Sequence, residues 1–214
     1  MTVKISPGPR AVKREPGAGF AFFPGIRHAP DMQREDLIRE LRAYLDRWPG
    51  EAETVGRFIG FVSEHPDCFE RRQETGHVTG SAWVVDCAGT RVLLTHHKKL
   101  GLWVQLGGHA DGDADVLRVA RREAEEESGL AGLALVPGGI FDVDVHRIPP
   151  GPDAPGHFHW DVRYAFRAAA GEAFRASDES YELRWVEIRS LAAVTQEESM
   201  LRMARKWLRR SGPA

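Results

Sequence analysis

Residues 107–130, GGHADGDADVLRVARREAEEESGL, join a glycine- and aspartate-rich turn to a helix that carries a block of carboxylates. Side chains three and four residues apart share one face of a helix, so Glu123, Glu126 and Glu127 converge. Glu125 points away from them. Like charges at this spacing repel, and a divalent cation such as Mg²⁺, which takes oxygen ligands, would remove the conflict. This stretch therefore predicts a carboxylate metal site on a helix.

The same helix carries an apolar stripe between about residues 114 and 128, and Ser128-Gly129 marks its end. A competing interpretation is a solvated acidic helix with surface ion pairs such as Arg122 with Glu126. The Gly-Gly turn, which permits close backbone approach, and the aspartates that follow it favour the metal site. The stripe consists of Val116, Leu117, Ala120 and Ala124.

The composition is that of an ordinary globular chain of 214 residues, long enough for one domain or one domain with an appendage. A formal net charge of -2 provides no basic field that would attract nucleic acid or a membrane surface. Cys68 and Cys87 form neither a disulfide framework nor a zinc spacing. There is no apolar run of membrane-spanning length and no secretory signal. These features predict a cytoplasmic protein without nucleic-acid or membrane partners.

The first 70 residues differ in pattern from the rest of the chain. Residues 1–30 are rich in glycine and proline, which predicts an irregular arm. Within it, residues 20–23 are too apolar for a free tail and would dock on the domain or on a second subunit, which leaves a homodimer open. Residues 31–70 show helical spacing broken at Pro49-Gly50 and predict a helical hairpin. Its apolar faces are Leu37, Leu41, Tyr44 and Leu45, then Val55, Phe58, Ile59 and Val62.

Residues 71–214 form the main domain and show the pattern of strands joined to helices. Apolar runs predict strands at residues 78–85, 91–97, 102–106, 134–136, 140–148, 158–166 and 183–188. The third of these leads into the Gly107-Gly108 turn. Thr195 and Glu198 fit a capping box at the start of a closing helix. The expected fold is a mainly antiparallel or mixed sheet with helices packed on it.

The segment from Gly108 to Leu130 resembles the Nudix box. That box runs Gly, five residues, Glu, seven residues, then Arg-Glu-apolar-x-Glu-Glu-x-Gly-apolar, and residues 122–130 match every fixed position of its second half. The first Glu of the box falls on Ala114, where the sequence departs from the family. In the family that Glu braces the loop by pairing with the box arginine, so Asp113 or Asp115 would pair with Arg122 here.

Three further segments resemble a bacterial Nudix subgroup with an N-terminal helical extension. They are His77-x-Thr79 with Ser81-Ala82, His96-His97-x-Lys99-Leu100, and Gly107-Gly108-His109-x-Asp111. The resemblance covers roughly residues 77–210. It implies a Nudix-type α/β/α sandwich of the α/β (α+β) class with a mixed sheet, preceded by the helical hairpin.

The resemblance also implies a metal-dependent hydrolase that cleaves a diphosphate linkage. Mg²⁺ or Mn²⁺ would be held by Glu123, Glu126 and Glu127, with the carbonyl of Gly107 as a further ligand. A carboxylate would activate the attacking water. Glu126 and Glu127 are candidates within the box, and Glu179 is a candidate from a later loop.

Other polar residues are candidates for substrate binding, each against the alternative of an ordinary surface or core role. His157 and His159 lie two apart on one strand, so with Asp161 they could form a zinc site of two histidines and a carboxylate. The favoured interpretation is a polar strand face that lines the substrate cleft. The candidate substrate-binding residues are His109, Arg91, Lys99, His159 and Arg163.

The function expected from this resemblance is hydrolysis of a nucleoside triphosphate to a monophosphate and pyrophosphate. An ADP-sugar or dinucleotide pyrophosphatase is an alternative. A non-catalytic Nudix module that binds or senses a nucleotide is another, which Ala114 favours and the intact glutamates oppose. Isomerase chemistry on a diphosphate would need an additional histidine and cysteine metal set, and the sequence does not display one.

Overall fold

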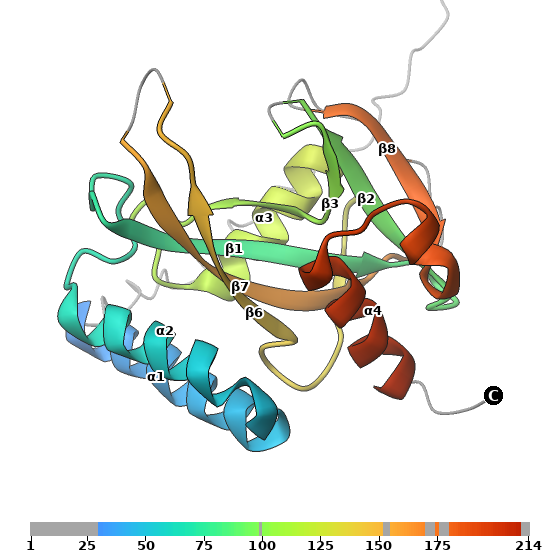
Figure 1. Cartoon of the computed structure of the whole chain (residues 1–214). Coiled ribbons are helices and arrows are strands. Elements are labelled where there is room, and N and C mark those ends of the chain that lie inside the picture. The colour runs from blue at the N-terminus through green and yellow to red at the C-terminus, as the bar shows by residue number, and fades with distance from the viewer. Residues whose placement is uncertain (1–29, 99, 152–154, 170–173, 176–179, 211–214) are drawn as a thin grey trace, which may run out of the picture.

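The computed structural model describes residues 30–98, 100–151, 155–169, 174–175 and 180–210 (Figure 1). Strands from these residues form one mixed sheet with helices on both faces, which confirms the expected α/β/α sandwich. The strands are β1 (Gly76–Val85), β2 (Arg91–His97), β3 (Leu102–Val104), β4 (Leu106–His109), β5 (Ala134–Leu135), β6 (Asp142–Ile148), β7 (His157–Arg167) and β8 (Ser180–Glu187). The helices are α1 (Pro30–Arg47), α2 (Ala52–Glu64), α3 (Val116–Ser128) and α4 (Glu198–Arg210), with 3-10 helices η1 (Pro49–Glu51) and η2 (Ile188–Ala193).

Strand β1 connects most of the sheet. It pairs in parallel with β7 and antiparallel with β2 and β4, and it is buried along its whole length. Strands buried on both faces are usually apolar throughout. The first half of β1 nevertheless carries His77, Thr79 and Ser81, which share one face because side chains alternate along a strand. This polar half of β1 lies in the middle of the candidate site.

The helices cover opposite faces of the sheet. Figure 1 shows α3 behind the sheet and α4 in front of it. Helix α3 shares one hydrophobic core with the α1–α2 hairpin. Helix α4 buries Met200, Met203 and Trp207 in a second core with Trp83 and Phe141. Within the described residues, no helix combines the length and apolarity that crossing a membrane requires.

The predicted N-terminal helical hairpin is present, and it packs on β7. The rings of Phe58 and Phe61 on α2 lie with their centroids 5.5 Å and 4.4 Å from that of Trp160. Phe61 completes the buried face of α2, whereas Ile59, predicted there, is only partly buried. The division of the chain at residues 30 and 70 stays a prediction. The irregular arm, including residues 20–23, lies outside the described residues.

Two local predictions were wrong. Gly107-Gly108 is not a turn but part of β4, because these glycines pair with Ser81 and Gly80 of β1. The chain turns later, at Asp111 and Gly112, which have φ angles of 50° and 83°. The closing helix begins at Glu198 rather than at Thr195, and the carbonyl of Glu197 accepts its first hydrogen bonds from the N–H groups of Met200 and Leu201.

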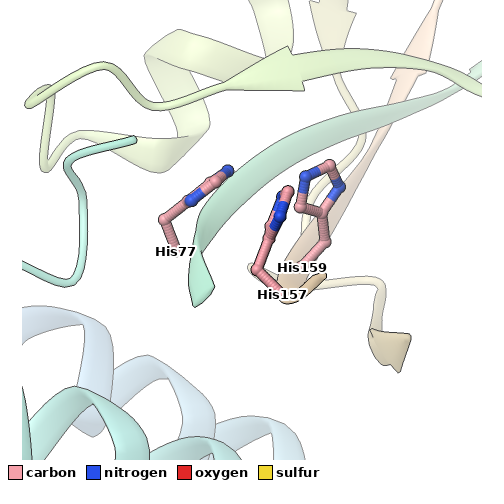
Figure 2. A group of neighbouring side chains, drawn as sticks. All are labelled: His77, His157 and His159. Carbon is pink, nitrogen blue, oxygen red and sulfur yellow. The ribbon is translucent and has the colours of Figure 1, made fainter. Parts of the chain in front are cut away.

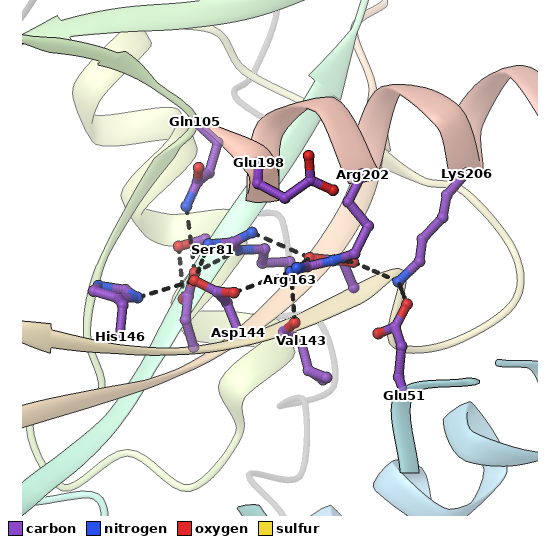
Figure 3. Close-up of polar contacts among 12 residues, drawn as sticks. Glu51, Ser81, Gln105, Val143, Asp144, His146, Arg163, Glu198, Arg202 and Lys206 are labelled. Carbon is purple, nitrogen blue, oxygen red and sulfur yellow. Dashed lines mark hydrogen bonds and ion pairs between the residues drawn. The ribbon is translucent and has the colours of Figure 1, made fainter. Parts of the chain in front are cut away.

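Buried charges join the sheet to α4 (Figure 3). The guanidinium of Arg163 on β7 is 2% exposed and pairs with Asp161 at 2.6 Å. It also pairs with Asp142 at 3.1 Å and with Asp144 at 3.3 Å. From α4, Arg202 pairs with the latter two carboxylates at 2.8 Å and 3.1 Å. A buried charge is tolerated only when it is paired and hydrogen-bonded, so these groups hold one another in place.

Asp144 is charged within this network. Burial opposes the charged form, but the hydrogen bond with His146 and the charges of Arg163 and Arg202 hold the pKa of the Asp144 carboxyl well below its usual range. Asp144 therefore contributes a negative charge to the network at neutral pH.

Lys206 of α4 extends the network to the hairpin. Its buried ammonium group pairs with Glu51 at 2.6 Å and contacts Asp142 and the hydroxyl of Tyr44. It also lies 4.9 Å from the ring of Trp48. One cation therefore contacts the end of α1, the 3-10 helix η1 and strand β6.

Replacing Lys206 with methionine should lower the free energy of unfolding by about 3 kcal/mol or more, because removal of one partner leaves buried charge uncompensated. Arg205→Met is the matched control on the same helix. Arg205 is 52% exposed and pairs with exposed Glu198, so its replacement should cost less than about 1 kcal/mol. Urea denaturation followed by circular dichroism measures both, and equal effects would contradict the structural role of Lys206.

Candidate active site

Helix α3 has well-defined ends. The carboxylate of Asp115 caps its first turn by accepting a hydrogen bond from the backbone N–H of Arg118 at 3.0 Å. Gly129 ends it with φ 67°, and the N–H of Gly129 donates to the carbonyl of Glu125 at 2.9 Å. The buried face is Val116, Val119, Ala120, Ala124 and Ser128. Val119 therefore takes the place predicted for Leu117, which is only partly buried.

Glu123 and Glu127 lie against the two glycines of β4. The backbone N–H of Gly107 donates to Oε1 of Glu127 at 3.2 Å. A Cβ atom at Gly108 would lie only 2.4 Å from Oε2 of Glu123, so this carboxylate touches the glycine backbone. The side chains of both glutamates are partly buried. The structure thus brings these two predicted carboxylates together with predicted Gly107.

Glu126 has a different environment. Its side chain is exposed, and with Glu125 it lines an open groove of about 370 Å³ together with Arg118, Arg121 and Arg122. The ligand atoms of Glu123, Glu126 and Glu127 do not all lie within 4.8 Å of one another; among the described residues only a group of histidines meets that condition. The metal and catalytic roles of Glu126 stay predictions.

Arg122 braces the loop between β4 and α3, but not through the predicted partners. Its Nη2 donates to Oε1 of Glu123 at 2.7 Å and to the carbonyl of His109 at 3.3 Å. Asp113 and Asp115 pair with Arg118 instead, at 2.6 Å and 3.8 Å. The predicted pairing of either aspartate with Arg122 was therefore wrong, because Arg118 lies closer to both.

Ala114, where the box lacks its first glutamate, faces the N-terminal hairpin. It packs against the main core and lines a groove of about 470 Å³ between α1 and the start of α3. Glu40 of α1 lines the same groove and accepts a hydrogen bond from the hydroxyl of Tyr164 at 2.9 Å. The small side chain of Ala114 therefore leaves space where the hairpin meets α3. Arg122 braces the loop between β4 and α3 although the box glutamate is missing.

A cluster of histidines lies at the edge where β1 and β7 begin (Figure 2). His77 pairs with His159 in the parallel β1–β7 ladder, and His157 follows on the same face of β7. One ring nitrogen from each of these three lies within 4.8 Å of the others. The ring of His109 on β4 lies 5.0 Å from those of His77 and His159, and that of His146 on β6 lies 5.4 Å from His159.

The inner histidines of this cluster are neutral at pH 7. Burial lowers the pKa of His77 and His109 to about 4, with smaller contributions from Arg71 and from the neighbouring rings. Burial and four surrounding histidines lower the pKa of His159 to about 2. Each of these rings therefore presents one N–H and one lone pair.

The site of His157, His159 and Asp161 that the sequence left open does not form. Asp161 is buried, and its carboxylate accepts hydrogen bonds from Thr79 and Ser81 at 2.9 Å and 2.8 Å as well as from Arg163. His77 stands in its place beside the two histidines of β7. One feature of the sequence could have indicated His77, because it begins a stretch in which polar residues alternate with others. The pairing of this stretch with β7 could not be read from the sequence.

Two further predicted residues, Arg91 and Arg163, make contacts of their own within the described residues. Arg163 belongs to the buried network, and the side chain of Arg91 pairs with Asp86 at 2.8 Å and covers the ring of Trp185 at 5.6 Å. Lys99 and Glu179 lie outside the described residues. Their predicted roles, like those of Arg91 and Arg163, stay predictions. Cys68 is buried and Cys87 exposed, and neither belongs to the histidine group.

Comparison with known proteins identifies a family. The family model described as NUDIX domain matches residues 76–209. The MutT protein from Methanosarcina mazei Go1 is similar in structure, with 17% identity, a TM-score of 0.50, and coverage of 66% of this chain and 99% of that chain. A NUDIX-family hydrolase from Clostridium perfringens is 26% identical, with a TM-score of 0.47 and coverage of 61% and 95%. No curated protein gives a significant match.

The two glycines of β4 should respond differently to replacement by alanine. At Gly107 a Cβ would meet Cα of Ser81 at 2.7 Å and the carbonyl oxygen of Gly80 at 2.8 Å, so β4 would have to move away from β1. At Gly108 it would meet only the end of the flexible Glu123 side chain. We expect Gly107→Ala to lower the free energy of unfolding by about 1–3 kcal/mol and Gly108→Ala by clearly less. Denaturant titration measures both, and a larger loss for Gly108→Ala would contradict this packing.

Proposed function

We propose a reaction for this chain, which belongs to the NUDIX family and is a pyrophosphohydrolase of that family. It cleaves a diphosphate linkage in a nucleoside triphosphate or a nucleoside diphosphate derivative with the help of divalent cations. A triphosphate that yields a monophosphate and pyrophosphate is the favoured substrate. An ADP-sugar or a dinucleotide is the alternative within the same chemistry. The cytoplasmic location and the homodimer stay predictions.

One arrangement carries this proposal: the carboxylates of Glu123 and Glu127 lie against the backbone of Gly108 and Gly107. Carboxylate and carbonyl oxygens are the ligands that Mg²⁺ prefers, and Mn²⁺ accepts the same set. The ligands proposed for such a cation are therefore both glutamates and the carbonyl of Gly107, and Glu126 stays a further predicted ligand. A cation bound there would neutralise the diphosphate and polarise the phosphorus under attack.

The chain's own residues have two tasks in this reaction. Arg122 positions Glu123 and, through the carbonyl of His109, the end of β4. A carboxylate must accept the proton of the attacking water from within hydrogen-bond reach. Glu126 and Glu127 are the candidates on α3, and Glu179 is the candidate from the later loop.

The predicted substrate contacts differ in their support. His109 is the best placed, because it lies on β4 directly after the two glycines that adjoin the carboxylates. Arg91 is engaged with Asp86 and Trp185, and Arg163 donates to buried aspartates, so both have less capacity for a phosphate group. Lys99 keeps its place as a candidate from the sequence.

Glu127→Gln should reduce Mg²⁺-dependent turnover on the order of 100-fold or more while the protein stays folded, because a ligand charge is lost. Glu125→Gln is the matched control on the same helix. It removes a charge of the same kind from a residue outside the proposed ligand set, so turnover should stay close to that of the wild type. Near-normal turnover of Glu127→Gln would contradict the mechanism.

The substrate is identified by incubating the full-length protein with a panel of nucleoside triphosphates, nucleotide sugars and dinucleotides, each with Mg²⁺ and with Mn²⁺. Chromatography of the products distinguishes release of pyrophosphate from cleavage into two monophosphates. Binding of a nucleotide without any turnover across the panel would contradict the hydrolase and support a nucleotide-binding module.

A further inference from the structure

We propose that His77, His157 and His159 form a transition-metal site, of the kind that binds Zn²⁺, separate from the carboxylates of α3. The three ligand nitrogens come from two neighbouring strands and lie within 4.8 Å of one another (Figure 2). This site goes beyond the proposed hydrolysis, and none of its three ligands belongs to the carboxylate set of α3.

Buried nitrogens without hydrogen-bond partners are the first argument. His77 is only 4% exposed, and among the described residues neither of its ring nitrogens has a hydrogen-bond partner. Nε2 of His159 is likewise buried and unpartnered. A buried polar atom without a partner costs about 1–3 kcal/mol, so native proteins rarely leave several of them together. A metal ion shared by these rings would use their lone pairs.

The orientation of His157 is the second argument. Its Nδ1 lies 2.9 Å from the carbonyl oxygen of Pro155. A carbonyl oxygen only accepts hydrogen bonds, so Nδ1 carries the proton and the lone pair lies on Nε2. Metal-binding histidines are commonly oriented in this way, with one ring nitrogen bonded to a backbone carbonyl and the other free to ligate.

The donor set indicates which metals the site would take. Imidazole nitrogens suit Zn²⁺, Co²⁺, Ni²⁺ and Cu²⁺, whereas Mg²⁺ prefers oxygen ligands such as those of Glu123 and Glu127. In a tetrahedral site with Zn–N bonds of about 2.0–2.1 Å, the nitrogens lie roughly 3.4 Å apart, so the rings need to close only slightly. Three histidines leave a fourth position open, which a water molecule would fill.

The sheet explains why the rings meet without help from flexible loops. The parallel register places His77 beside His159, and alternation places His157 on the same face. Asp161, next along that face, is fully engaged with Thr79, Ser81 and Arg163, so it does not compete for the ion. This set consists of histidines alone, so it is not the histidine and cysteine set that isomerase chemistry would need. Neither cysteine belongs to this set.

The test is a titration of metal-free, full-length protein with Co²⁺ in the presence of excess Mg²⁺, which occupies the carboxylates of α3. Co²⁺ in a tetrahedral nitrogen site absorbs visible light strongly, whereas Co²⁺ bound to oxygen ligands absorbs weakly. We expect one equivalent to bind with the strong absorption and to be displaced by Zn²⁺. His157→Ala and His159→Ala should each weaken binding on the order of 100-fold or more.

His96→Ala is the matched control, because His96 stacks on Trp103 at a centroid distance of 5.1 Å and belongs to a different strand. It should bind Co²⁺ like the wild type. His157 is only partly buried, so His157→Ala keeps the test valid if replacement at the more buried positions disturbs folding, which circular dichroism monitors. Absence of the strong absorption in the wild type, or unchanged binding in folded His157→Ala, would overturn the site. Either result leaves the nucleotide hydrolysis test unaffected.

Discussion

The parallel pairing of β1 with β7 is the constraint on which the rest of the structure depends. It runs unbroken from Gly76 opposite Phe158 to Val85 opposite Arg167. Because strand side chains alternate with a period of two, a slip of one residue would move every side chain of β7 to the other face. The observed register places His159 beside His77, and it places Thr79 and Ser81 where both donate to Asp161.

This register puts polar residues where a sheet of this kind is usually apolar, and the surrounding elements compensate for them in two ways. Towards the middle of β7, Asp161 and Arg163 satisfy one another and the aspartates of β6, and α4 supplies Arg202 and Lys206. Towards the start of β7, His159 stays neutral, and its ring contacts those of His77 and His157. The charged groups around Asp161 and Arg163 are all paired with one another within the chain. The histidine group contains ring nitrogens of His77 and His159 that have no hydrogen-bond partner within the described part of the chain.

Local patterns were enough to predict much of this fold. Helical spacing located the hairpin, and the strands were found with small errors at their ends. The glutamates of α3 are easy to recognise because they lie close together in one short segment of the sequence. The resemblance to the Nudix box agrees with the NUDIX family match over residues 76–209. These features depend on residues close together in the chain, so a single sequence contains the information.

What the sequence did not reveal depends on contacts between distant residues. Gly107-Gly108 suggests a turn by composition, and only pairing with β1 makes it a strand. Arg122 has several acidic neighbours in the sequence. In the fold it donates to the carbonyl of His109, and Arg118 takes Asp113 as its own partner. His77 and His159 are 82 positions apart, and nothing short of the β1–β7 register brings them together.

Lys206 has a consequence for how the molecule comes apart. Its ammonium group contacts Glu51 and Tyr44 of the hairpin region and Asp142 of the sheet from a helix near the C-terminal end. Fraying of the hairpin alone would strip this cation of two partners while Asp142 stays buried. Partial opening therefore carries the cost of buried charge that has lost its partners. The hairpin, the sheet and the last helix should melt in a single cooperative transition, even though their sequences suggest an added segment beside a self-contained domain.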